Sequence, residues 1–133
     1  MGSEAGQARR LHSSLVSVMK LETALGLVGV GWAPIVRKYF AMVELLQQAT
    51  DDEIEVVEVG HRIGMIEFKA LTGDHIMQDV LNRVSWTFER DSARICEVCG
   101  GKGFRRKSLP GSPNRCRQHY LELANELAEH GEI

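Results

Sequence analysis

Four potential metal ligands occur in two matched pairs in the last third of this 133-residue sequence, and their spacing constrains the fold more than any other feature. Two residues separate Cys96 from Cys99, two separate Cys116 from His119, and sixteen lie between the pairs. A two-residue gap lets both side chains of a pair turn toward one ion, so two such pairs make a closed tetrahedral site. Three thiolates with one imidazole favour zinc over other metals. The spacing therefore predicts a structural zinc site.

The odd number of cysteines, three, argues against a closed set of disulfides. A redox Cys-x-x-Cys motif would need a helix running directly on from it, whereas Gly100-Gly101-Lys102-Gly103 follows here. Three free cysteines in a reducing interior would leave the matched spacing and His119 without a role. We expect Gly100 and Gly103 to bring the backbone close to the metal and to offer N–H groups to the sulfur atoms.

A catalytic zinc ion would require a different pattern, because such a site keeps one coordination position open for water. The sequence has no His-Glu-x-x-His, and it lacks the His-x-Glu and Pro-Cys-x-x-Cys pair of nucleobase deaminases. A non-enzymatic protein is therefore expected. A zinc-dependent hydrolase or nuclease is kept as an alternative, with these candidate acid–base residues: His61, His75, Glu67, His12 and His130.

The loop between the two ligand pairs is basic, in a chain whose formal net charge is −2, and we call it the basic zinc loop. No acidic residue occurs between Glu97 and Glu122. The cations of this segment are Lys102, Arg105, Arg106, Lys107, Arg115 and Arg117. Two interpretations are open: a loop that contacts nucleic-acid phosphates, with Phe104 as a stacking ring, or a solvated loop whose charge offsets the thiolates.

Hydrophobic spacings of three and four residues predict helices before the cysteines, over residues 11–25, from Trp32-Ala33-Pro34 to about Ala49, and from about Asp74 to Ala93. Asp74 is the expected N-cap of the third helix. We expect its inner face to be a stripe of four residues widened by two more: Ile76, Val80, Val84 and Phe88, with Met77 and Leu81. A last helix should begin at Cys116 or His119, with Tyr120, Leu123, Ala124 and Leu127 inside.

Apolar and charged residues alternate between the second and third helices, as half-buried strands do. The predicted strands contain Ile54, Val56 and Val59, then Ile66, Phe68 and Ala70. We expect the segment between Gly60 and Gly64 to connect them as a hairpin. The glycine-rich run 26–31 is interpreted as a helix end and loop, because no strand precedes it and no Gly-Lys-Ser/Thr follows it.

These patterns predict an α+β fold, with helices packed on a small two- or three-stranded antiparallel sheet and a C-terminal zinc module. We divide the chain into a core over 1–94 and a zinc-binding module with its helix over 95–133. No apolar stretch is long enough to span a membrane, and the first ten residues lack the apolar region of a signal peptide. We therefore expect a cytoplasmic protein that does not enter membranes; the oligomeric state is left open.

Three groups of residues resemble those of small zinc-finger proteins of uncharacterised function, commonly encoded by phages and prophages. They are Gly31-Trp32 opening a helix, the hairpin from Val56 to Ala70, and a helix leading into Cys96-Glu97-Val98-Cys99-Gly100 with Arg115-Cys116 and His119. The resemblance covers about residues 29 to 119. It implies a treble-clef-like zinc module fused to a small α+β unit, with Cys96, Cys99, Cys116 and His119 as ligands. It implies no particular activity.

The leading functional hypothesis is a regulatory protein that contacts nucleic acid through the basic zinc loop. The second is a protein-interaction module that binds or inhibits a host protein, favoured by the acidic run from Asp51 to Glu58 and by four glutamates after residue 121.

Overall fold

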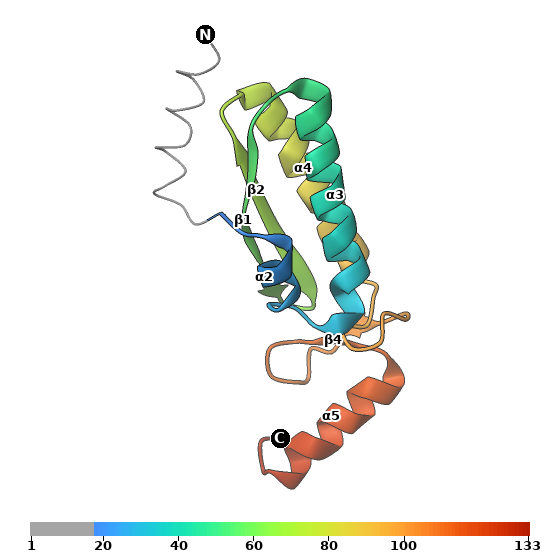
Figure 1. Ribbon diagram of the computed structural model, residues 1–133. Coiled ribbons are helices and arrows are strands. Elements are labelled where there is room, and N and C mark those ends of the chain that lie inside the picture. Colours follow the sequence, from blue (N-terminus) through green and yellow to red (C-terminus); the bar gives the residue numbers. More distant parts are fainter. Residues whose placement is uncertain (1–17) are drawn as a thin grey trace.

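The computed structural model describes residues 18–133. In chain order the helices and strands are α2 (Leu21–Leu25), the 3₁₀ turn η1 (Val30–Trp32), α3 (Ala33–Thr50), β1 (Ile54–Arg62), β2 (Met65–Thr72), α4 (His75–Ser92), β3 (Phe104–Arg105), β4 (Asn114–Arg115) and α5 (Arg117–Glu129). Helices α3 and α4 lie side by side along the β1–β2 hairpin, and the cysteine-rich segment and α5 follow at one end of this body (Figure 1). The predicted α+β class is confirmed.

The predicted first helix is only partly covered by the structure, since residues 11–17 lie outside the described part of the chain. Within that part the helix is short, Leu21–Leu25, and Gly26 follows it as the C-cap, as expected. Residues 18–20 are not helical; the Met19 amide instead donates to the carbonyl of Val56 on β1 (2.7 Å). Pairing with the edge of the hairpin thus competes with helix formation at these residues.

The hairpin connection is shorter than predicted. β1 runs on through Arg62 and β2 begins at Met65, so the prediction of a longer connection between Gly60 and Gly64 is wrong. Ile63 and Gly64 alone form the turn, with φ of 47° and 79°. Positive φ at both central residues matches the twist of the flanking strands, whereas a longer loop would forgo their pairing.

A β-bulge between Val56 and Glu58 explains the uneven spacing of the apolar residues on β1. Ile54 and Val56 are two residues apart, but Val59 follows after three, and all three side chains are buried. The extra residue in β1 restores the alternation, so that one face of the strand stays in the core. The hairpin and the second pair, β3 with β4, are separate two-stranded sheets.

Helix α4 begins where predicted, since Asp74 Oδ2 accepts a hydrogen bond from the Met77 amide (2.8 Å). Its inner face, however, is rotated from the predicted stripe. Met77 and Leu81 are buried, whereas Ile76 is 65% exposed and Val80 is also exposed. At the start of the helix the buried positions are therefore 77 and 81, one residue after the predicted 76 and 80.

Polar side chains of α4 complete the outer edge of β2. The amide of Ile66 donates to Ser92 Oγ and that of Phe68 to Glu89 Oε2, both at 2.8 Å. Gln78 accepts from the Thr72 amide and donates to the Ala70 carbonyl. An open strand edge carries unpaired polar groups and invites pairing with other chains. Here one helix satisfies that edge, which lets a sheet of two strands persist.

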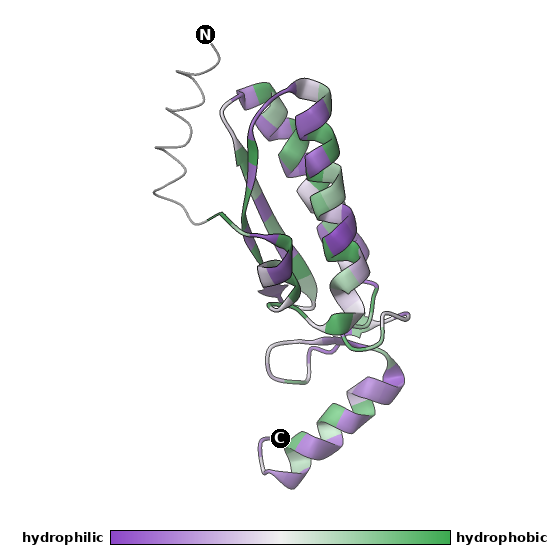
Figure 2. Ribbon diagram, in the orientation of Figure 1, coloured by the Kyte–Doolittle hydropathy of each residue, from purple (hydrophilic) through white to green (hydrophobic). Residues whose placement is uncertain are grey.

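The core between helices and hairpin is an aromatic cluster around Tyr39. Its ring stacks on Phe68 at 4.1 Å between centroids and meets Phe88 edge-on at 5.6 Å. Its hydroxyl pairs with Ser85 Oγ at 2.8 Å, so the buried oxygen is satisfied. Burial raises the pKa of Tyr39 to about 12, which keeps the phenol neutral. Figure 2 shows hydrophobic and hydrophilic residues alternating along the hairpin and along α3 and α4.

Candidate metal centre

The first ligand pair lies on a tight turn after α4. The amide of Gly100 donates to the Cys96 carbonyl (2.9 Å), and the amide of Cys96 donates to the Gly101 carbonyl (2.7 Å). Gly100 has φ +79°, a conformation that glycine adopts without strain. We call residues 95–101 the zinc knuckle. This turn holds the Cys96 and Cys99 side chains toward one point.

The sulfur contacts within the knuckle differ from the prediction. Gly101, not Gly100 or Gly103, donates its amide to Cys99 Sγ (3.4 Å). The amide of Gly103 donates to the carbonyl of Arg94 (2.9 Å) and so extends the backbone pairing of Ile95 with Lys102. The Gly100 and Gly103 amides therefore donate to backbone carbonyls and not, as the prediction had it, to sulfur.

The second ligand pair flanks the start of α5. Cys116 is the residue before its first turn, and His119 lies within that turn. This ligand pair is therefore held at the N-terminal end of α5. The predicted start of the helix at Cys116 or His119 differs by one or two residues from the observed first residue, Arg117.

The four predicted ligands converge, since their ligand atoms all lie within 4.8 Å of one another. Cys99 Sγ is 3.9 Å from Cys116 Sγ, and His119 Nδ1 is 3.1 Å from Cys116 Sγ and 3.7 Å from Cys96 Sγ. A tetrahedral zinc ion with Zn–S bonds of about 2.3 Å would hold two sulfurs about 3.8 Å apart. The donor set and its spacing thus fit one zinc ion with all four positions filled by protein.

Electrostatics favour a thiolate in this cluster. Burial raises the pKa of the Cys96 thiol, but backbone amides of Cys116, Cys99 and Val98 outweigh burial and lower it to about 6. The Gly101 amide lowers the pKa of Cys99, but desolvation and the neighbouring thiols Cys96 and Cys116 raise it overall. A divalent cation would remove this conflict, because it stabilises all three thiolates at once.

The imidazole of His119 offers Nδ1 to the cluster, and its other nitrogen faces the acidic side of α5. Nε2 lies 4.0 Å from Glu122 Oε2, one turn along the helix. A carboxylate near the distal nitrogen of a metal-binding histidine fixes its tautomer and orientation. Glu122 is therefore placed to support His119 from outside the ligand set.

Hydrogen bonds fasten the zinc knuckle to the α+β core. The Gly31 amide donates to the Glu97 carbonyl, and the Trp32 indole donates to the Ile95 carbonyl, both at 2.8 Å. Gly31 and Trp32 are buried at the junction of η1 and α3. The knuckle therefore rests directly on the start of α3.

Asn114 forms a second, fully buried link. Its Nδ2 donates to the Ala93 carbonyl (2.6 Å) and to the Gly64 carbonyl (3.0 Å), joining the end of α4 to the hairpin turn. Its amide donates to the Glu97 side chain, and its carbonyl accepts from the Glu97 amide. Sequence reasoning missed Asn114, Glu97 and Trp32 as structural residues of the site. Only the chain order Cys-Glu-x-Cys hinted at Glu97.

The residues of the basic loop fall into two groups. Arg106 and Arg115 are held in place: the Arg106 guanidinium lies over the Tyr120 ring and its Nε donates to the Arg115 carbonyl, while Arg115 Nη2 is 3.9 Å from Glu97 Oε2. The remaining cations are exposed and form no ion pair with an acidic residue of the described chain: Lys102, Arg105, Lys107 and Arg117. Phe104 lies among them and is 52% exposed.

Helix α5 extends away from the rest of the molecule beyond the cluster (Figure 1). The predicted inner residues, Tyr120, Leu123, Ala124 and Leu127, are all only half-buried, and no residue of the helix is buried. Figure 2 shows hydrophobic and hydrophilic residues mixed along its length. The helix is thus anchored at its first turn and carries an apolar stripe that no other element of residues 18–133 buries.

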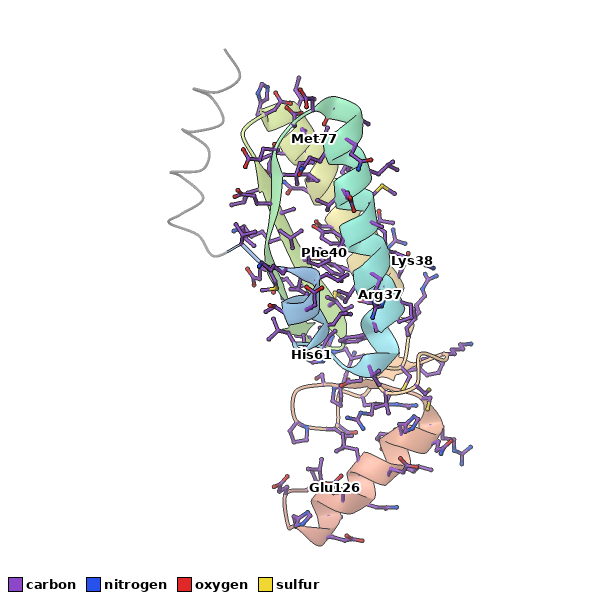
Figure 3. The ribbon with its side chains drawn as sticks, in the orientation of Figure 1. Arg37, Lys38, Phe40, His61, Met77 and Glu126 are labelled. Atoms are coloured by element: carbon purple, nitrogen blue, oxygen red, sulfur yellow. The ribbon has the colours of Figure 1, made fainter. Side chains whose placement is uncertain are left out.

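The candidate acid–base residues do not gather at the cluster in the described chain. His61 stacks on Trp32 (5.6 Å between centroids), near the end of the hairpin and the start of α3 (Figure 3), and its Nε2 accepts from the Gly64 amide (3.3 Å). Glu67 Oε1 lies 3.5 Å from Arg62 Nη1. His75 is the first residue of α4, whereas the knuckle follows the last turn of that helix. His130 bonds the Glu126 carbonyl, and His12 lies outside the described residues.

Comparison with protein-family models, with curated proteins and with solved structures gives no significant match for this chain. Among the described residues, no helix is both long enough and apolar enough to cross a membrane.

Proposed function

We propose that the chain is a non-enzymatic zinc-binding adaptor, with zinc held by Cys96, Cys99, Cys116 and His119. The convergence of three sulfurs and one imidazole nitrogen within 4.8 Å carries this proposal. A knuckle followed by a pair at a helix start supports a treble-clef-like module, and a regulatory role in phage or prophage biology rests on the resemblance stated above. The filled ligand set leaves no position for a reacting water, which favours a structural ion.

We further propose that the adaptor contacts nucleic acid through its basic zinc loop. The support is the set of exposed cations that form no ion pair with the described acidic residues, carried on a segment that the metal would hold rigid. Phosphate contacts release counterions, so the affinity should fall steeply with salt concentration. The protein would act from the cytoplasm.

Fluorescence anisotropy with labelled oligonucleotides across salt concentrations tests this contact. Lys102→Glu with Lys107→Glu should weaken binding and reduce the salt slope by about 2, since each lost phosphate contact reduces it by about 1. The matched control is Arg37→Glu with Lys38→Glu, two exposed cations on α3 outside the loop (Figure 3). Equal loss in both double variants, or no binding by the native protein at low salt, would contradict the proposal.

A second candidate function is docking of a host protein on α5. The observation that favours it is an apolar stripe on a 13-residue helix that the described part of the chain does not bury. Helices of this length are marginal in water without packing. Glu122, Glu126 and Glu129 flank the stripe, so the partner should present an apolar groove with a basic rim. Leu123→Asp with Leu127→Asp should abolish capture of that partner from host lysate, whereas Leu45→Asp, an exposed leucine on α3, should not. Retained capture by the double variant would exclude α5 as the contact.

A further inference from the structure

Cations and aromatic rings alternate along one side of the basic loop. Lys102 Nζ lies 5.5 Å from the centroid of Phe104, and the Arg106 guanidinium lies 5.5 Å from the same centroid. That guanidinium is 4.5 Å from the Tyr120 ring, which α5 supplies. The order along this row is therefore Lys102, Phe104, Arg106 and Tyr120.

The extended backbone of this segment explains the row. Phe104 belongs to β3, and Lys102 pairs across the knuckle with Ile95, so the chain is extended on both sides of Gly103. Side chains two residues apart in an extended chain point to the same face. This places a cation before and a cation after the Phe104 ring, and leaves Arg105 to point the other way, toward Gly64.

The Phe104 ring itself is not used for the core, since it is 52% exposed. Arg106, by contrast, is held by the Tyr120 ring and by its bond to the Arg115 carbonyl. Lys102 and Arg106 both lie over this exposed ring, and only Arg106 is held by further contacts. This arrangement matches what an unpaired nucleotide offers, namely a flat base between two phosphates.

Resting on the proposed nucleic-acid contact, we infer that the basic loop is selective for single-stranded nucleic acid. An unpaired base takes the place of Lys102 Nζ over the Phe104 ring and stacks there. Lys102 and Arg106 then contact the phosphates on the two sides of that base. Bases in a duplex are already stacked on each other and present only their edges in the grooves, so this ring cannot reach a base face there. Selectivity for single strands then follows from the ring, while the cations supply affinity for either form.

Anisotropy with a thymidine 15-mer, a uridine 15-mer and a 15-base-pair DNA duplex tests this inference. We expect the native protein to bind both single strands at least tenfold more tightly than the duplex. Phe104→Leu should weaken binding to the single strands roughly 5- to 150-fold, the range measured for loss of one base–aromatic stack. The same variant should leave duplex binding unchanged. A preference between the two single strands would identify DNA or RNA as the partner and would support the platform.

Two results separate the possible failures. If duplex and single strands bind equally and Phe104→Leu matches the native protein, the stacking platform is overturned while the phosphate contact stands. If no oligonucleotide binds at low salt, the phosphate contact fails as well. Because Phe104 is exposed, Phe104→Leu should fold, and Phe104→Tyr, which keeps a ring, should restore most of the single-strand affinity. Failure of Phe104→Tyr to do so would also count against stacking.

Discussion

Gly31→Ala should separate the zinc knuckle from the α+β core. Gly31 is buried, and its amide donates to the Glu97 carbonyl at 2.8 Å. A Cβ at this position would overlap the Cys96 carbonyl oxygen and would lie 2.6 Å from the Gly100 amide nitrogen. All of these neighbours are backbone atoms, so none can rotate away, and the knuckle as a whole has to shift.

The expected loss follows from the contacts that this shift disturbs. Overpacking in a filled interior costs about 1–3 kcal/mol, and the bond from Gly31 to Glu97 contributes about 0.5–1.5 kcal/mol. The adjacent bond from the Trp32 indole to Ile95 would be strained by the same movement. Together we expect a decrease of about 2–4 kcal/mol in the free energy of unfolding, or roughly 10 °C in melting temperature for a chain of this size.

Urea unfolding followed by circular dichroism, at constant excess zinc, measures this free energy. The rate of zinc transfer to a chelator is a second measurement. It should be higher in Gly31→Ala, because the displaced knuckle holds Cys96 and Cys99 less well. The matched control is Gly60→Ala on β1, where a Cβ would meet no atom within 4 Å. We expect that control to lie within about 0.5 kcal/mol of the native protein.

A Gly31→Ala variant that unfolds within about 0.5 kcal/mol of the native protein and releases zinc at the native rate would show that the knuckle is not packed closely on Gly31. An equal cost for Gly60→Ala would show that the effect comes from replacing any glycine.

Three further predictions concern the cluster and the core. Cys99→Ser should lower zinc stoichiometry, measured by elemental analysis, together with the melting temperature, because one ligand is lost and the remaining thiolates repel each other; retention of both would overturn the zinc assignment. Asn114→Ala should cost about 2–4 kcal/mol in urea unfolding, since the Ala93 and Gly64 carbonyls lose a buried donor; a cost below about 0.5 kcal/mol would show that the amide is dispensable. The pKa of Tyr39 is raised from 10.0 to about 12 in the folded protein. Its contribution to the free energy of unfolding is therefore fully present below pH 10 and is lost as the pH rises through about 12. Urea unfolding at pH 9 and 11 should show that loss in the native protein and not in Tyr39→Phe, and identical slopes would refute the assignment to Tyr39.

Local patterns in the sequence determined the elements of the core closely. The helix that opens at Trp32-Ala33-Pro34 and the helix capped by Asp74 occur where predicted, since capping residues, proline and apolar spacing act over a few residues. Errors arose where neighbours in space decide, and two of them lie in the hairpin turn and on α4. The hairpin turn contracted to Ile63 and Gly64 because pairing through Arg62 is favoured, and the face of α4 rotated to suit the hairpin it covers.

The basic loop shows a similar division. The sequence identified its cations and Phe104, but it could not tell which cations are free. The Arg106 side chain donates to the Arg115 carbonyl, 9 residues away, and the Arg115 side chain faces the Glu97 carboxylate, 18 residues away. Lys102 and Lys107 stay exposed. The last ring of the row, Tyr120, comes from α5. No local sequence pattern connects it to Arg106.

The candidate ligand set could be predicted from local spacing, because the Cys-x-x-Cys gap and the Cys-x-x-His gap each restrict one pair to a short turn whatever surrounds it. The attachment of that set to the core depends on contacts between distant segments. Gly31, Trp32 and Asn114 join the knuckle to α3, α4 and the hairpin turn through hydrogen bonds over tens of residues. Such contacts have no periodicity along the chain, since each depends on two segments meeting in space, and the buried amide of Asn114 has meaning only after the carbonyls of Ala93 and Gly64 have been brought to it.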